Sequence, residues 1–213
     1  MKYTEELSKL IIDNIEQHER SHLVIEEVDR VVIKAIEKET EAFFEGFDSK
    51  LIEKESYSFY DYDAMSLSFF EWRVEGNENN LFGINLVPYS DNGEETQSWL
   101  AYLCGIPYKS TGLSLQFFTE HQKVGITANN LKKFLVTFLE ESLKLRENGF
   151  KVDSTGYYIE KTFNFDKDII LQYYPHQLPK AMNPLTDTLQ TFQECKPEFD
   201  RLVEELKLQG ANG

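Results

Sequence analysis

The sequence is poor in the residues that interrupt regular structure or cross-link a chain. Its 213 residues include only 11 glycines, 6 prolines and 2 cysteines. Disordered and collagen-like chains are much richer in glycine and proline, and small domains held by disulfides are much richer in cysteine. Because 41% of the residues are hydrophobic, a chain of this length can bury a core without cross-links. We therefore expect a folded protein that needs neither a disulfide nor a metal for stability.

Signals for secretion and membrane insertion are also missing. The first six residues lead directly into an acidic amphipathic pattern, without the apolar stretch and cleavage site of a signal peptide. No hydrophobic run approaches the roughly 18 residues of a membrane span. Cys104 and Cys195 lie in apolar or helical surroundings, so we expect two free, mostly buried thiols, as is usual in a reducing compartment. The sequence predicts a cytoplasmic protein that has no membrane partner.

Positive charge is scarce. The chain has 22 lysines and arginines against 37 aspartates and glutamates, which gives a formal net charge of −15. Binding to duplex nucleic acid normally needs clustered Lys and Arg side chains that replace counterions. We therefore expect no direct binding to duplex nucleic acid, and a basic protein surface is the more natural partner.

The common nucleotide-binding and serine-hydrolase strings are absent, and we expect no cofactor. One string does match a catalytic motif: residues 18–22 have the H-E-x-x-H spacing of zinc peptidases. On a helix, His18 and His22 lie one turn apart on the same face, so both imidazoles can reach one Zn²⁺, and Glu19 can serve as general base. A zinc-dependent hydrolase is therefore one hypothesis.

The surroundings of this string favour a structural role. Glu16 and Arg20 place charges beside and inside the motif, where zinc peptidases usually carry uncharged residues. Glu26 continues the same helix face, so no third ligand comes from a separate element. The preferred interpretation is that His18 and His22 occupy semi-buried positions on a long helix, and that the protein has no catalytic or metal site. The zinc hydrolase remains the alternative.

Residues 4–44 carry apolar or histidine side chains at helical spacing. The pattern predicts one helix, or two with a break near Ser21, that ends at Gly46. Its steps average close to 3.5 residues, so this segment can pack along another helix in the same chain or in a second copy, as a homodimer. The positions are Leu7, Ile11, Ile15, His18, His22, Ile25, Val28, Val32, Ile36 and Phe43.

The remaining chain alternates strand-like and helix-like patterns. Residues 56–63, 64–75, 81–89 and 112–119 favour strands, and 99–106 fits a strand or a short helix. Thr127 predicts the start of a helix that ends at 148–149. A hairpin follows around 153–156, and prolines at 184 and 197 predict the first turns of C-terminal helices.

Together these patterns predict an α+β fold, in which an antiparallel sheet is covered by packed helices, with a long N-terminal helical arm and a C-terminal helix. We expect residues 1–50 to form the arm and 51–213 the α+β domain, as one continuous structural unit.

Residues 55–95 hold nine acidic side chains and one basic side chain, which gives this stretch a charge of −8. A carboxylate cluster of Asp61, Asp63, Glu71 and Glu75 can be considered for a metal-dependent nuclease. However, residues 71–73 read E-W-R and lack the lysine that such a site needs. Solvated acids on the outer face of a sheet are the simpler explanation.

Aromatic residues are interleaved with these acids, and this combination suits a surface that docks a basic protein. The predicted partner-binding residues are Asp61, Asp63, Glu71, Trp72, Glu75 and Glu78. If instead the rings are all core and the acids all solvated, no such face exists. The sequence thus favours a non-catalytic acidic binding protein: an inhibitor, immunity protein or chaperone-like factor of a microbe or phage. Its expected target is a basic surface such as that of a nucleic-acid-binding enzyme.

Overall fold

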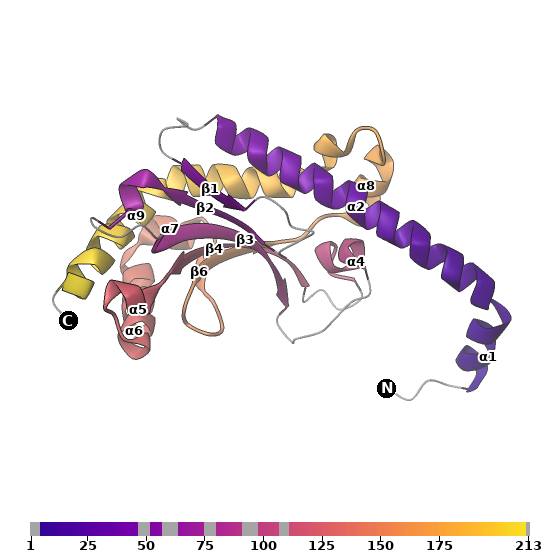
Figure 1. The fold of residues 1–213 in the computed structure, drawn as a ribbon, viewed down its shortest axis with the longest axis horizontal. Coiled ribbons are helices and arrows are strands. Elements are labelled where there is room, and N and C mark those ends of the chain that lie inside the picture. The colour runs from indigo at the N-terminus through magenta and orange to yellow at the C-terminus, as the bar shows by residue number, and fades with distance from the viewer. Residues whose placement is uncertain are drawn as a thin grey trace.

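The computed structural model describes residues 5–46, 52–56, 64–74, 80–90, 98–106 and 111–211, without the side chains of residues 7, 18 and 52–56. It confirms the predicted α+β class. An antiparallel sheet lies beneath two long helices, α2 (Ile15–Glu45) and α9 (Asn183–Ala211), which pack against each other (Figure 1). The other described helices are α1 (Glu5–Asp13), α4 (Trp99–Leu103), α5 (His121–Val124), α6 (Ala128–Glu141), α7 (Leu143–Glu147) and α8 (Lys167–Tyr173), with short 3₁₀ helices η1 (Phe70–Trp72) and η2 (Leu178–Ala181).

The described strands form one sheet in the order β1-β2-β3-β4-β6-β5. Their bounds are β1 Ile52–Ser56, β2 Met65–Phe69, β3 Phe82–Ser90, β4 Thr111–Thr119, β5 Lys151–Val152 and β6 Ile159–Phe163. The longest pairing joins β3 and β4, from Phe82 opposite Thr119 to Ser90 opposite Thr111. Because side chains alternate along a strand, Leu113, Leu115 and Phe117 share the face that α9 covers.

The other face of the sheet carries a polar row fixed by the strand register. Asn85 of β3 lies opposite Ser66 and Gln116, and Gln116 lies opposite Glu160 of β6. The Glu160 carboxylate is buried, and it accepts hydrogen bonds from the Ser114 hydroxyl at 2.7 Å and from Gln116 at 3.1 Å. The Lys151 ammonium lies 3.5 Å from the same carboxylate, and the three partners together offset a charge that would otherwise be costly to bury.

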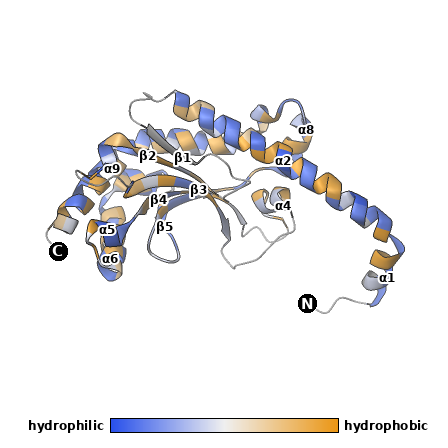
Figure 2. Ribbon diagram, in the orientation of Figure 1, coloured by the Kyte–Doolittle hydropathy of each residue, from blue (hydrophilic) through white to orange (hydrophobic). Residues whose placement is uncertain are grey.

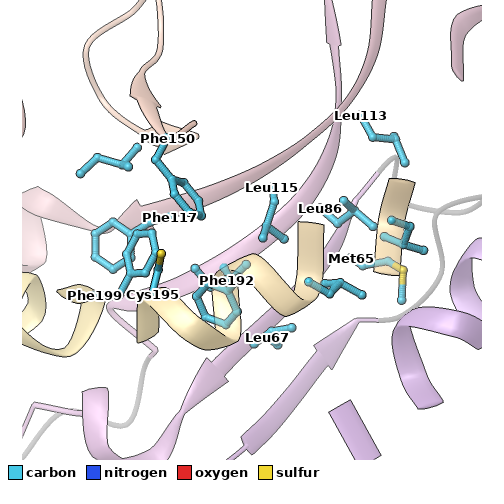
Figure 3. Close-up of a cluster of buried hydrophobic side chains, with 14 of the residues drawn as sticks. Met65, Leu67, Leu86, Leu113, Leu115, Phe117, Phe150, Phe192, Cys195 and Phe199 are labelled. Carbon is cyan, nitrogen blue, oxygen red and sulfur yellow. The ribbon is translucent and has the colours of Figure 1, made fainter. Parts of the chain in front are cut away.

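The core centres on aromatic rings where α9 crosses the sheet (Figure 3). Phe199 of α9 stacks on Phe117 of β4 with ring centroids 5.7 Å apart, and it meets Phe192 at 5.4 Å and Phe150 at 5.2 Å. All four rings are less than 5% exposed. Offset and edge-to-face contacts of this kind stabilise a core beyond the burial of apolar area alone.

The N-terminal helix breaks at Asn14. The sequence pattern allowed for a break, but placed it near Ser21. The Asn14 side-chain amide donates to the carbonyl of Leu10 at 2.8 Å, and this local bond competes with helix continuation. Ser21 instead donates its hydroxyl to the carbonyl of Gln17 at 2.7 Å and stays inside α2. The predicted end at Gly46 is confirmed, because α2 stops at Glu45 and the Gly46 amide bonds the carbonyl of Phe43.

Residues 70–72 form a 3₁₀ helix, so the prediction that the strand continues to residue 75 was wrong. The alternation of Phe70, Trp72 and Val74 with charged residues imitates a strand pattern. In the structure β2 ends at Phe69 and the tight turn directs Trp72 into the core, where its indole N–H donates to Asp200 at 2.7 Å. Arg73 meanwhile lies 4.4 Å from the ring centroid of Phe70.

The C-terminal region is one helix, although Pro197 predicts the first turn of a separate helix. Pro197 removes one backbone N–H from α9, and Figure 1 shows this helix changing direction towards its C-terminus, as an internal proline requires. The helix continues because Phe192 and Cys195 before the proline, and Phe199 and Leu202 after it, are all fully buried in the same core.

Two predictions in the middle of the chain are confirmed. Thr127 caps α6, since its hydroxyl oxygen accepts from the Asn130 amide at 3.4 Å. Gly149 follows the end of α7 with a φ of +80°, which glycine adopts without steric cost. The helix between these points is divided at Ser142 into α6 and α7. Residues 99–103, left open between strand and helix, form α4.

Candidate functional site

Four of the predicted partner-binding residues, Asp61, Asp63, Glu75 and Glu78, lie outside the described residues. Their arrangement relative to one another stays a prediction. The two remaining residues of that set, Glu71 and Trp72, belong to η1 and are described in full.

Trp72 is 2% exposed, and its ring packs against Phe69 at 4.7 Å and Phe117 at 5.7 Å between ring centroids. The indole therefore belongs to the core of this chain. Trp72 also fixes η1 to α9 through its hydrogen bond to Asp200. The ring of this segment that does reach the surface is Phe70, which is 40% exposed.

Glu71 forms an ion pair with Lys196 of α9. The Lys196 ammonium also lies 2.8 Å from Asp200 and 4.6 Å from the ring centroid of Phe69, and its side chain is only 14% exposed. The carboxylate of Glu71 is thus already matched to a partly buried cation of its own chain. In the described structure Glu71 serves mainly to attach η1 to the C-terminal helix.

The zinc-motif residues lie on the first half of α2. The His22 side chain is 64% exposed, so the expectation of a semi-buried position was wrong for this residue, and its Nδ1 lies 3.9 Å from Glu26. Glu19 is exposed, and the position of the His18 side chain is outside the description. Within the described residues, no group of three histidine, cysteine, aspartate or glutamate side chains lies close enough to hold a metal ion. The zinc alternative stays a prediction that still needs a third ligand.

A hollow of about 710 Å³ lies where Cys104 meets the start of α8, lined also by Asn164, Asp166 and Lys167. Burial, and then the negative charge of Asp166, raise the pKa of the Cys104 thiol to about 11. The thiol therefore stays protonated at neutral pH and is a weak nucleophile. Cys195 is fully buried, and the prediction of two free cysteines is confirmed.

The most exposed described part of the chain is a projecting helical segment, residues 5–27. It is shorter than the predicted arm of residues 1–50, and from here on the arm means residues 5–27. It consists of α1 and the first part of α2, and Figure 1 shows it extending beyond the sheet. Every described side chain in it is exposed except that of Asn14. Hydrophobic residues recur along it nonetheless (Figure 2). Its exposed large apolar side chains are Leu10, Ile11, Ile12, Ile15, Leu23, Val24 and Ile25.

The buried face of α2 continues into the arm. From residue 29 onward this face packs on the rest of the domain, which we call the body, and Asp29, Val32 and Ile36 are all buried. Continued towards the N-terminus in steps of three and four, the same face passes through positions 25, 22, 18 and 15. We call these four positions the outer stripe. Of its members, Ile15 is 54% and Ile25 is 39% exposed.

The arm is also rich in acids. It contains seven carboxylates and two cations, a net charge of −5 with the histidines neutral. Both cations are engaged within the arm, Lys9 with Glu5 at 2.7 Å and Arg20 with Glu16 at 2.6 Å. The other five carboxylates are Glu6, Asp13, Glu19, Glu26 and Glu27. Among them Glu6, Asp13 and Glu19 form no ion pair with any described residue.

Asp29 fixes the base of the arm to the body. This carboxylate is 6% exposed, and it accepts hydrogen bonds from the backbone amides of Trp99 and Leu100, each at 2.8 Å, and from the Ser98 hydroxyl at 3.3 Å. It therefore caps the first turn of α4 from another helix. Sequence reasoning missed this contact, although an aspartate at an apolar stripe position is a signal that can be searched for.

Comparison with family models, curated proteins and solved structures finds no match for this chain. Among the described helices, none combines the length and the apolar character that crossing a bilayer requires.

Proposed function

We propose that this chain is a non-catalytic protein-binding module of the cytoplasm that covers a basic surface of a partner protein. An inhibitor, an immunity protein and a chaperone-like factor all work in this way, and the positively charged surface of a nucleic-acid-binding enzyme is a fitting target. The single observation that carries the proposal is the surface of the arm, which is both apolar and acidic. It holds seven of the fourteen large apolar side chains that are exposed among the described residues, and it has a net charge of −5.

An exposed apolar surface of this extent needs a partner. Single exposed apolar side chains are normal on a monomer, but a concentration of seven large ones within residues 5–27 is typical of a binding segment. The arm consists of two helical pieces, α1 with 9 residues and residues 15–27 of α2, and each is of a length that is marginally stable in water without tertiary packing. A partner that covers the arm would supply this packing.

The acids of the arm favour a cationic partner. Negative charge around an apolar surface attracts basic partners and repels acidic ones, and this steering weakens as salt is added. Glu6, Asp13 and Glu19, which form no ion pair with described residues, are available for such contacts.

The test is capture from an extract of the native host by the immobilised full chain, followed by mass spectrometry of proteins released in salt steps. We expect partners with an excess of lysine and arginine, released by added salt. The triple variant Glu6→Gln, Asp13→Asn and Glu19→Gln should lose most of the capture. A matched control, Glu140→Gln, Glu141→Gln and Glu147→Gln, removes the same charge from exposed positions of α6 and α7 and should keep it. Acidic partners, or capture insensitive to salt, would contradict the proposal.

The same proposal has a second element, the partner-binding surface predicted from the sequence. Its acidic residues are Asp61, Asp63, Glu71, Glu75 and Glu78. Reversal of Glu71 would place a lysine beside Lys196 and disturb the fold, so it is unsuitable as a test. Glu75→Lys with Glu78→Lys avoids this ion pair. We expect the double variant to weaken partner capture with an unchanged melting temperature. Full affinity at both low and physiological salt would remove these residues from the proposed surface.

Zinc hydrolysis through His18, Glu19 and His22 remains the alternative proposal. It requires stoichiometric zinc in protein purified without a histidine tag, and this zinc should disappear in His18→Ala. Such a result would replace the binding function with the catalytic one.

A further inference from the structure

We propose that the outer stripe, positions 15, 18, 22 and 25, binds a basic amphipathic helix of the partner. This inference rests on the proposed function and adds the form of the partner and the face that receives it. The arm would then pack lengthwise along the partner helix, in the way that α2 already packs along the body.

The spacing of the outer stripe suits one helix. Positions 15 and 25 are isoleucines and positions 18 and 22 are histidines. They are separated by three, four and three residues, which is the spacing of two successive heptads in helix pairs. A stripe this narrow matches a single helix better than a broad flat surface. The stripe is continuous with the buried face of α2, so a helix docked there extends a packing surface that the fold already uses.

A second copy of the chain is a poorer occupant than a basic helix. Two arms would bring charges of −5 and −5 together. The two cations of each arm, Lys9 and Arg20, are already counted in this net charge, so a second arm adds no positive charge to balance the first. A partner helix with lysines or arginines beside its apolar row instead meets Glu19 and Glu26, which flank the stripe.

The experiment uses a fluorescent synthetic peptide of about 21 residues, with leucine at the heptad a and d positions and lysine elsewhere. This peptide is titrated with the full chain. A peptide with glutamate in place of lysine is the control. We expect the lysine peptide to bind and to gain helical circular dichroism, and the glutamate peptide not to bind. In Ile25→Asp the dissociation constant should rise about tenfold or more.

Val24→Asp is the matched control. Val24 is the neighbouring residue and is 62% exposed, but it lies off the outer stripe. The substitution introduces the same charge and the same helix propensity, so it should change the dissociation constant less than about twofold if the stripe is the contact face. Equal losses in Ile25→Asp and Val24→Asp would overturn the assignment of the stripe.

Other outcomes separate this inference from the proposed function. If basic host proteins are captured in a salt-dependent way but the lysine peptide does not bind, the helical form of the partner is wrong and the binding function stands. If neither is bound, both fail. Sedimentation equilibrium that shows a dimer abolished by Ile25→Asp would identify a second copy as the occupant and overturn the inference.

Discussion

The two parts of α2 carry the same pattern in different surroundings. From residue 28 to 45 the apolar face is buried against α9, α4 and η2, with Ile33 and Ile36 each 2% exposed. From residue 15 to 27 the same face carries two isoleucines and two histidines, and Ile15 is 54% and Ile25 is 39% exposed. Periodicity thus indicates which face of a helix is apolar. It does not indicate whether the covering partner belongs to the same chain.

The two parts of α2 should differ most in how much stability is lost when an isoleucine is shortened to alanine. Ile36→Ala should lower the free energy of unfolding by about 2–5 kcal/mol, because it opens a cavity in packed surroundings. Ile15→Ala should change it by less than about 0.5 kcal/mol, because the side chain is already in water. Urea denaturation of both variants measures the contrast. Similar losses would mean that the arm is packed in solution and would remove the basis of the comparison.

A smaller effect is expected at the boundary between the two parts. Asp29→Ala leaves the amides of Trp99 and Leu100 without their acceptor and should cost about 1–3 kcal/mol. Asp13→Ala in the arm is the matched control and should be close to neutral. Thermal unfolding followed by circular dichroism compares them, and a neutral Asp29→Ala would show that the arm base does not depend on this carboxylate.

A still smaller, pH-dependent effect distinguishes an acid of the body from one of the arm. Burial alone would raise the pKa of the Glu198 carboxyl. The hydrogen bond from the Ser142 hydroxyl and the guanidinium of Arg201, each at 2.9 Å, outweigh burial and hold the pKa below its ordinary value of 4.5. A lowered folded-state pKa stabilises the protein above pH 4.5, and this contribution is lost as the pH falls through the folded-state value.

Glu198→Gln should therefore destabilise the protein at pH 7 by about 1 kcal/mol, and the difference from the parent should shrink as the solution becomes more acidic than pH 4.5. Glu19→Gln should have no effect on stability at either pH, because Glu19 forms no ion pair with described residues. Urea denaturation at pH 7 and at about pH 3 provides the measurement. A constant difference across pH would contradict the assigned cause.

The smallest effect on stability is expected from removal of the arm itself. A chain that starts at residue 28 retains all the buried residues of α2 and should unfold within about 1 kcal/mol of the full chain. The same deletion should abolish binding of the lysine peptide. Calorimetric unfolding and peptide titration on one preparation test both statements, and a large loss of stability would assign the arm to the core.

Patterns of local origin were predictable from the sequence. The α+β class, the cap at Thr127 and the helix end at Gly46 depend on neighbouring residues, and the structure confirms them. Pro197 and the turn at Trp72 were not, because distant contacts decide them: a continuous core along α9, and the bond from the indole to Asp200, 128 residues away. The exposure of His22 was missed for the same reason, since spacing alone cannot tell a covered stripe from an uncovered one.

The Asp29 carboxylate makes the direction of the arm depend on a remote part of the sequence. The arm portion of α2 is 13 residues long, or about 20 Å at the rise of an α-helix. A small tilt at its pivot therefore becomes a displacement several times larger at its tip. That pivot is set by the backbone of residues 98–100, some seventy positions along the chain. Substitutions near Ser98 are thus expected to change the direction of the arm without any change in the sequence of the arm.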